Sequence, residues 1–355
     1  MNYVIINGVN SNTIPGLLIQ SLPPISKPLM RTEVVEIDGR DGDIVYELGY
    51  SAYDKQISIG LHGNFDIDQV IKFFTGKGTV IFSNEPDKYY NFQIINQIDY
   101  QRLLRYRTAT ITMHVQPYKY AVEDMNILRN ITAKTNAALG GISCLPDGTR
   151  IHISGTSTGG MRSYWLNPVT VLDGDQLLYK VTGTGSATIA LYDNDSTTQT
   201  ITGSATGWTL DDLSFAEGDA INSIRVTVAN GSEVDLYLTL YLIRNASERY
   251  YGNLGNTVAK PKFVIVGKGI FVMKINGNAC MTFQCGDTRQ CMIVDTDGMN
   301  VRLEDGTWFN RNITAQYDLT HIQPDNSCTV SFELEQSVSP GEVIACACEN
   351  QSRWI

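Results

Sequence analysis

The alternation of apolar and polar residues along this chain predicts a protein built mainly of β-strands. From residue 32 to 63, two β-rich runs flank a tight polar turn. The turn consists of Asp38, Gly39, Arg40, Asp41 and Gly42. Asp-Gly pairs tolerate positive φ and fit turns that reverse a strand. Ile57, Ile59 and Leu61 then alternate with polar residues, which is the period of a half-buried strand. The stretch therefore predicts a long β arm followed by a strand of a sheet.

One segment after the arm has the periodicity of a helix. Its apolar residues at 67, 70, 71 and 74 fall on one helical face. Asp66 is suited to cap the first turn, and Gly76 or Gly78 to end the helix. A basic stretch, residues 102–107, follows the next hairpin. It is either a solvated turn or a contact with acidic groups of a neighbouring subunit, and we favour the turn.

Two changes of sequence character divide the chain into three predicted domains: 1–125, 126–250 and 251–355. The middle region is rich in Thr, Ser, Gly and Asp. Its short, evenly spaced apolar runs, separated by turn clusters, indicate a β-sandwich. A further β-rich region begins near Lys260, with a hairpin signal at Asn276-Gly277-Asn278. The predicted fold class is mainly β, and the first domain is expected to be β-sandwich-like with one short helix.

The composition agrees with this pattern and excludes some functions. Only 18% of the 355 residues are charged, and Gly and Tyr are plentiful, which suits strands and turns. The net charge of −10 is spread evenly, which argues against nucleic-acid binding by phosphate neutralisation. No run approaches the roughly 18–20 apolar residues of a membrane span, and the N-terminus lacks the basic region of a signal peptide. We expect synthesis in the cytoplasm, no membrane insertion, and seven free cysteines that serve mostly as core side chains.

No catalytic constellation stands out in the sequence. The four histidines are scattered, and there is no Gly-x-Ser-x-Gly, phosphate-loop or His-Glu-x-x-His motif. Two acidic turns, at residues 193–195 and 295–298, could offer oxygen ligands to calcium. Neither completes the spaced acidic loop that calcium sites use, so turn chemistry is the better account. We expect a protein that is not an enzyme and has no cofactor and no metal.

Aromatic residues of the middle region suggest a carbohydrate site. Sugar rings stack on exposed aromatics, while Asp and Asn bind the hydroxyls. The alternative is that half of these aromatics are core residues; in Tyr164-Trp165, strand alternation turns one side chain inward and one outward. We favour the core for any single residue and sugar binding for the module as a whole. The candidates are Tyr164, Trp165, Tyr192, Asp193, Asp195 and Trp208.

Landmarks in the first third of the chain follow a recognisable order. An N-terminal strand ends in Asn7-Gly8, and the IDGRDG turn and the short helix follow. A PDKYY hairpin at 86–90 and a closing QPYKY at 116–120 complete the series. This order resembles the distal tail protein (Dit) family of long-tailed phages that infect Gram-positive bacteria.

Two later regions carry further resemblances. The phrase PDGTRIHISGT at 146–156 resembles jelly-roll, carbohydrate-binding-like modules of phage tail proteins. The KPKFVIVGKG start at 260–269, with the turns that follow it, resembles the C-terminal galectin-like β-sandwich of the Dit family. In the usual members that domain follows the first almost directly, whereas here 126–250 intervenes. The chain therefore resembles an evolved Dit with an inserted module.

The resemblance implies a structural protein of the virion that forms a homohexameric ring between tail tube and baseplate. The implied partners are other copies of the chain, the major tail tube protein, a tail-associated lysin or tail-fibre hub, and receptor-binding proteins. The inserted module would touch host cell-wall polysaccharide, and the turn at 38–42 would lie at a subunit contact. The alternatives are a stand-alone bacterial carbohydrate-binding protein and a glycan-degrading tail enzyme, for which no acid pair stands out.

Overall fold

The computed structural model describes residues 1–39, 41–95, 100–124, 126–134, 137–193, 197–247, 249–336 and 340–355. Within these residues the fold is mainly β, as predicted. The chain divides into two compact units. The first comprises Met1–Met125, Leu254–Val258 and Gln351–Ile355, and the second comprises Asn126–Asn253 and Ala259–Asn350. The division into three domains is finer than this and stays a prediction.

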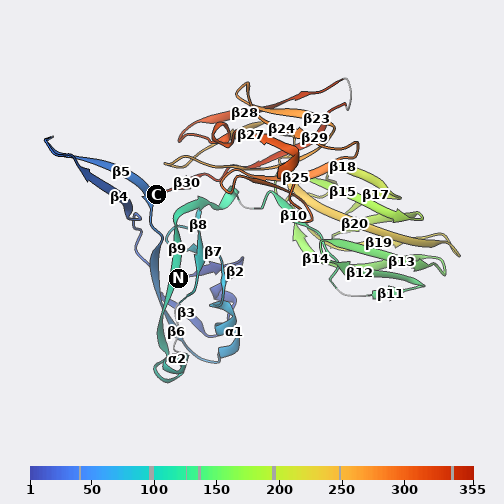
Figure 1. Ribbon diagram of the computed structural model, residues 1–355. Coiled ribbons are helices and arrows are strands. Elements are labelled where there is room, and N and C mark those ends of the chain that lie inside the picture. Colours follow the sequence, from blue (N-terminus) through green and yellow to red (C-terminus); the bar gives the residue numbers. More distant parts are fainter. Residues whose placement is uncertain are drawn as a thin grey trace. The chain divides into compact units, whose positions relative to one another are not determined.

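The first unit is built on one antiparallel sheet with the strand order β2-β1-β7-β8-β9-β6-β3 (Figure 1). Its strands are β1 (Val4–Ile6), β2 (Val9–Asn10), β3 (Leu17–Ser21), β6 (Tyr53–Leu61), β7 (Lys77–Phe82), β8 (Lys88–Gln93) and β9 (Thr108–Ala121). A late segment, β30 (Arg353–Trp354), returns to pair with β9. The alternation predicted for β6 is confirmed, because Ile57, Ile59 and Leu61 are buried in the core.

Helices cover the core of this sheet. The predicted helix is confirmed as α1 (Ile67–Phe73), and the Asp66 carboxylate caps it by accepting from the backbone N–H of Asp68 at 3.0 Å. The basic stretch predicted as a solvated turn is instead part of a second helix, α2 (Tyr100–Tyr106). This segment contains good helix formers such as leucine and arginine, and Leu103 is fully buried in the core. Short 3₁₀ segments are η1 (Ser11–Thr13), η2 (Val122–Asp124), η3 (Asn310–Asn312) and η4 (Tyr317–Thr320).

The predicted hairpin at the turn 38–42 is present and stands apart from the main sheet. β4 (Met30–Glu36) and β5 (Asp43–Tyr50) form a two-stranded sheet of their own, which we call the arm. Figure 1 shows the arm extending away from the sheet of the first unit. Gly39 and Gly42 have φ values of +81° and +79°, a region that favours glycine, so their predicted role in shaping the backbone is confirmed.

Residues 126–253 of the second unit contain the predicted β-sandwich, which we call the middle sandwich. One sheet has the order β11-β12-β13-β20-β15-β18, with β10 beside β20, and the facing sheet has the order β14-β19-β16-β17. The bounds are β10 (Leu128–Asn130), β11 (Ala137–Leu139), β12 (Ile142–Asp147), β13 (Arg150–Thr156), β14 (Met161–Thr170), β15 (Asp175–Thr184), β16 (Ala187–Tyr192), β17 (Thr198–Gly203), β18 (Thr206–Asp212), β19 (Ala220–Thr227) and β20 (Glu233–Arg244). Apolar residues of both sheets, such as Ile153 and Ile224, form one core between them.

A C-terminal sandwich follows. Its sheets have the orders β21-β28-β23-β24-β27 and β26-β25-β22-β29. The bounds are β21 (Tyr250–Gly252), β22 (Lys262–Lys268), β23 (Ile270–Ile275), β24 (Asn278–Gln284), β25 (Gln290–Asp295), β26 (Asn300–Leu303), β27 (Ile313–Ala315), β28 (Ser327–Leu334) and β29 (Glu342–Glu349). The hairpin signal at Asn276-Gly277 is confirmed as the turn between β23 and β24. Phe263 and Phe271 lie in the core between the two sheets.

The two sandwiches pack against each other within the second unit. Trp208 and Tyr241 of the middle sandwich share a buried cluster with Val264 of the C-terminal sandwich. Beside it, the Arg289 guanidinium bonds both carboxylate oxygens of Glu342, at 3.1 and 2.7 Å, and donates to the Trp208 carbonyl oxygen at 2.7 Å. Arg289 and Glu342 both belong to the C-terminal sandwich, so their bidentate pairing orients the guanidinium that bonds Trp208 of the middle sandwich.

The cysteines are core residues, as predicted. All seven are free; six are buried and Cys348 is half-buried. Burial raises the pKa of Cys144 and of Cys280 to about 12, because a thiolate loses its hydration in the core. These thiols are therefore unreactive at neutral pH.

Candidate functional site

The arm has two chemically different faces. In the strand register Val35 lies opposite Ile44, and Val34 lies opposite Val45. Residues directly opposite each other share a face, and neighbours along a strand point to opposite faces. Val35, Ile44 and Tyr46 therefore lie on one side together with Glu33, the partner of Tyr46, and we call this side the apolar face. The other side, the acidic face, carries Val34 and Val45 among carboxylates: Glu36, Asp43 and Glu47.

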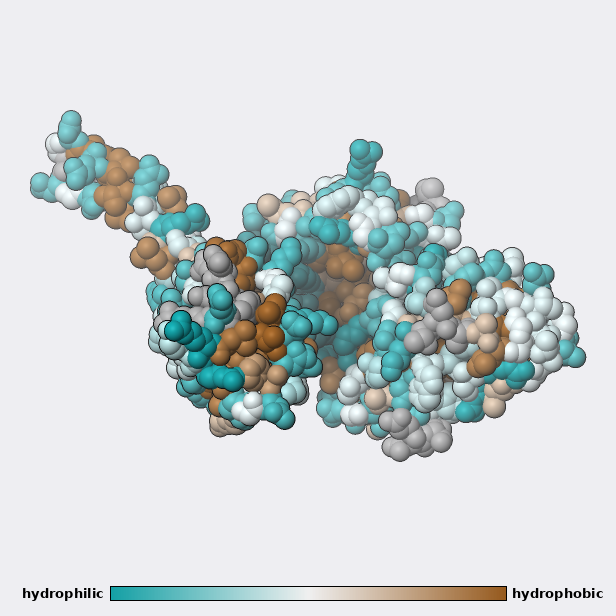
Figure 2. All heavy atoms as spheres, turned by 90° about the horizontal axis from the view of Figure 1, so that it is seen from below, coloured by the Kyte–Doolittle hydropathy of each residue, from teal (hydrophilic) through white to brown (hydrophobic). Residues whose placement is uncertain are grey.

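The apolar side chains of the arm are exposed to solvent. Tyr46 is 52% exposed, and Val35 and Leu48 are exposed as well. Figure 2 shows hydrophobic residues gathered along the projecting hairpin at the upper left, flanked by hydrophilic ones. An isolated two-stranded hairpin is marginally stable in water, and an exposed apolar patch marks an interaction surface. The arm therefore has the properties of a docking element.

The chain that leads into the arm is fixed to the sheet by side chains that bond backbone carbonyls. Lys55 Nζ donates to the Pro24 carbonyl oxygen at 3.0 Å, and Asn84 Nδ2 donates to the Pro23 carbonyl oxygen at 3.0 Å. On the return path, the Ser51 N–H donates to the Leu29 carbonyl oxygen at 2.8 Å. The root of the arm is thus ordered although its outer part contacts solvent.

Lys55 is an unusual residue for a strand interior. It is 3% exposed, and its Nζ lies 4.8 Å from the ring centre of Tyr90 and 5.5 Å from that of Tyr53. The nearby Glu85 carboxylate accepts from Tyr90 Oη at 2.6 Å and pairs with Lys119. Burial lowers the pKa of Lys55 to about 8, because the loss of hydration outweighs the attraction of Glu85.

This shift makes the stability of the first unit pH-dependent. Between pH 8 and about 10.5, the unfolded chain holds a proton on Lys55 that the folded chain has lost, so this group makes the unfolding free energy rise with pH. The unfolding free energy of the wild type minus that of Lys55→Met should therefore rise between pH 8 and about 10.5. In protein labelled with 5-fluorotryptophan, urea unfolding of the first unit can be followed at the Trp354 resonance. A constant difference from pH 7.5 to 10 would contradict the assignment.

The six predicted sugar-binding residues do not form one site. Tyr164 is 2% exposed, and its Oη donates to the Ile142 carbonyl oxygen at 2.8 Å. Trp208 is fully buried at the joint between the sandwiches. Neither ring presents a face to solvent, so both are corrected to core residues. Asp195 lies outside the described residues, as does Arg40 of the predicted assembly turn, whose other members are exposed at the tip of the arm.

Trp165 and Tyr192 are brought together on the outer face of the sheet β14-β19-β16-β17. Each lies opposite Ser223 of β19 in the strand register, so the three form a cross-strand row, which we call the aromatic row. Trp165 is 66% exposed, and strand spacing separates it from Tyr192 by roughly 10 Å. The Arg225 guanidinium lies 3.9 Å from the Tyr192 ring centre. Next to the row, the Asp193 carboxylate accepts from the Thr197 N–H at 2.9 Å.

The aromatic row offers the Trp165 ring and the Ser223 hydroxyl to a ligand, and the Arg225 guanidinium lies beside it. Ser223 and Arg225 were not predicted, because they lie on β19, far along the chain from Trp165. The signal that could have found them is the pairing of β14 and β16 with the same strand, which only the fold supplies. This combination suits the stacking and hydrogen bonding of a sugar.

The described residues contain no cluster of three or more His, Cys, Asp or Glu side chains placed to hold a metal ion. In the turn at 295–298, which the sequence offered as a possible calcium site, the Asp295 carboxylate accepts from the backbone N–H groups of Asp297 and Gly298, at 3.1 and 2.9 Å. This is the turn chemistry favoured from the sequence. None of the helices described has both the length and the apolar character needed to cross a membrane.

Comparisons with known proteins found a distant likeness among solved structures. No family model matches the sequence, and no curated protein matches it. Among solved structures, the chain is similar to the crystal structure of "SPP1 Dit (gp 19.1) Protein, a Paradigm of Hub Adsorption Apparatus in Gram-positive Infecting Phages". The sequences are 10% identical, the alignment covers 98% of this chain and 99% of that chain, and the TM-score is 0.44. A likeness at this level does not by itself assign a fold family or a function.

Proposed function

We propose that the protein is a structural subunit of a phage tail tip, a distal tail protein that forms a ring of six copies between tail tube and baseplate. The observation that carries this proposal is the arm, with an ordered root and an exposed apolar face. The strands of a lone hairpin leave backbone groups unpaired at both edges, which can pair with another chain. The partner of the arm is a second copy of this chain, and repeated head-to-tail contacts close into a ring when the rotation between successive copies closes.

The remaining parts of the proposal follow from the ring. The exposed turn Asp38, Gly39, Asp41 and Gly42 would lie at the subunit contact. The tail tube protein, the tail-associated lysin or fibre hub and the receptor-binding proteins would occupy other surfaces of the ring. The role is structural and requires no catalysis, cofactor or metal.

The middle sandwich would contribute to host recognition through the aromatic row. An exposed Trp165 beside Tyr192 suits stacking on cell-wall polysaccharide. Six such sites on one ring would bind a polymer with avidity even when each is weak. A stand-alone carbohydrate-binding protein could use the same row, but the arm has no role in it, so the ring is the better proposal.

Electron microscopy of the purified full chain tests the ring. We expect closed particles of uniform subunit number in negative stain, and a single large species in sedimentation velocity whose share rises with protein concentration. A chain that stays strictly monomeric at the highest soluble concentration would contradict self-assembly through the arm.

A further inference from the structure

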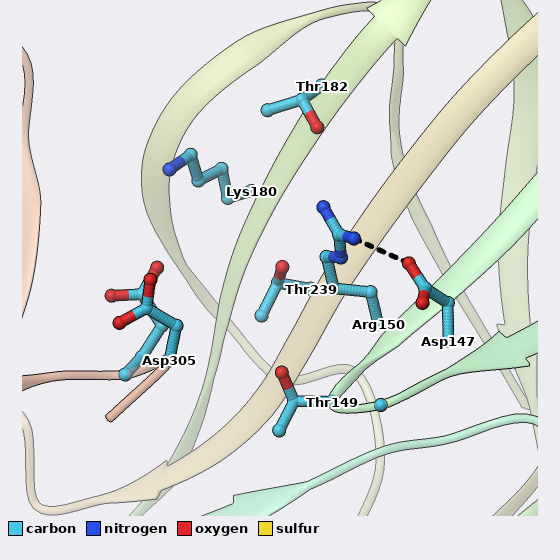
Figure 3. Close-up of a pocket in the computed structure, with 9 residues that line it drawn as sticks. Asp147, Thr149, Arg150, Lys180, Thr182, Thr239 and Asp305 are labelled. Carbon is cyan, nitrogen blue, oxygen red and sulfur yellow. Dashed lines mark hydrogen bonds and ion pairs between the residues drawn. The ribbon is translucent and has the colours of Figure 1, made fainter. Parts of the chain in front are cut away.

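The second unit contains a polar cavity that lies apart from the aromatic row. Its volume is about 580 Å³, within the range of small-molecule sites. One wall is the outer face of the middle sandwich, at β13, β15 and β20, and the other is the turn that follows β26 of the C-terminal sandwich. Figure 3 shows Arg150, Lys180 and Thr239 on strands of the first wall and Asp305 on the separate segment. Neither sandwich alone contains the whole site.

Strand register places the groups of the first wall in order. Thr239 lies opposite Arg150 on one side and opposite Lys180 on the other, so the three form a row across β13, β20 and β15. Lys180 and Thr182 face outward because their neighbours Tyr179 and Val181 are buried in the sandwich core. The first wall therefore presents Lys180 and the Arg150–Asp147 ion pair, with hydroxyls between and beside them (Figure 3).

The facing wall presents two carboxyl groups, and one of them has a buried oxygen without a partner. Glu304 Oε2 is buried and has no hydrogen-bond partner among the described residues. The Asp305 carboxylate accepts from the Thr307 N–H at 2.8 Å, which lowers its pKa and keeps it ionised. Across the cavity, Lys180 Nζ lies 5.7 Å from the Trp208 ring centre and makes no hydrogen bond or ion pair within the described residues. Buried polar groups without partners require an explanation, such as a bound ligand.

The arrangement selects one class of ligand. An anion such as phosphate would meet Lys180 and Arg150 but also the carboxyl groups of Asp147, Glu304 and Asp305. A cationic amine would meet these carboxyl groups but also the two cations. An apolar molecule would leave the lining groups unpaired and desolvated. Sugar hydroxyls both donate and accept, so a neutral sugar satisfies both walls together.

We propose that this cavity binds an uncharged sugar residue, whose hydroxyls accept from Lys180 and Arg150 and donate to Glu304 and Asp305. The site goes beyond the proposed function, because it is distinct from the aromatic row and requires no ring. It would fit one or two sugar units in a pocket, whereas the aromatic row is an open surface. A long chain could engage both.

Saturation-transfer NMR on the full-length protein tests the proposal with glucose, galactose, rhamnose and N-acetylglucosamine as probes. We expect transfer to at least one sugar, and a shift of the Trp208 resonance in protein labelled with 5-fluorotryptophan. Lys180→Met and Glu304→Gln should each weaken binding roughly tenfold or more, because the first removes a donor to the sugar and the second replaces an acceptor oxygen with an N–H₂ donor. Thr182→Val, which keeps the side-chain shape, should weaken it less.

Two controls make the result specific. In Trp165→Ala, the sugar-dependent shift of the Trp208 resonance should persist, because that resonance reports on the cavity beside Lys180 and not on the aromatic row. Sodium phosphate should not shift the Trp208 resonance. The proposal is overturned if none of the four sugars receives transfer, if binding survives both charge-removing substitutions, or if phosphate alone shifts Trp208. Failure of ring formation would leave this result untouched, so the two proposals fail separately.

Discussion

Replacing Trp208 by alanine is expected to lower the free energy of unfolding of the second unit by about 3–5 kcal/mol. The indole is fully buried at the joint between the sandwiches, against a cluster that includes Val264 and Ala345. Truncation leaves a cavity that two rigid sheets cannot close. Urea denaturation of protein labelled with 5-fluorotryptophan measures the effect, because Trp165 and Trp308 report on the second unit and Trp354 on the first.

The matched substitution is Trp165→Ala, on an exposed tryptophan of the same sandwich. It should change the unfolding free energy by no more than about 0.5 kcal/mol and yet weaken binding to purified host cell-wall polysaccharide. Trp308→Ala, at an equally exposed ring of the C-terminal sandwich, should affect neither. If Trp208→Ala unfolds no earlier than the wild type, the joint is not a rigid contact. If Trp165→Ala binds polysaccharide as the wild type does, the aromatic row is not the site.

Val35→Asp is expected to weaken self-association of the chain by roughly tenfold to hundredfold, without destabilising the first unit. Val35 lies on the apolar face of the arm, where a carboxylate would be buried against a neighbouring copy. The arm adds no side chain to the core of the first unit, so the monomer should unfold within about 0.5 kcal/mol of the wild type. Sedimentation velocity across a concentration series measures the association.

The adjacent residue supplies the control. Val34→Asp makes the same chemical change one position away, on the acidic face. It should weaken association far less, because that face already carries Glu36, Asp43 and Glu47. Equal losses for the two variants would show that both faces are buried and would contradict the assignment of an apolar docking face. If neither variant weakens self-association, the arm is not part of the contact between copies.

Features that depend on neighbouring residues were predictable from the sequence. The alternation of Ile57 and Ile59 in β6, the Asp66 cap of α1 and the turn at Asn276-Gly277 each follow from a local period or a local backbone preference. Gly39 was predictable as a turn residue for the same reason. Local rules of this kind do not need the rest of the chain.

Features that depend on distant residues were not predictable in the same way. Trp208 lies among polar and small neighbours, which gave it the pattern of a loop residue; only the C-terminal sandwich, far along the chain, buries it. The sequence did not predict α2, because the segment is rich in charged residues and Leu103 alone of its leucines is buried in the core. The aromatic row and the polar cavity both arise from strand pairing, which places Ser223 beside Trp165, and Thr239 between Arg150 and Lys180.

The return of β30 to the first unit bears on how the protein is made. Arg353 pairs with Tyr120 of β9, and the Leu254 N–H donates to the Ser352 hydroxyl at 3.1 Å, so the first unit draws on three separate stretches of sequence. The ribosome must synthesise the whole second unit before β9 receives its last partner. The first unit of a nascent chain therefore stays incomplete until residues 351–355 have been synthesised. That delay would postpone any pairing of arms until each chain can close its own sheet.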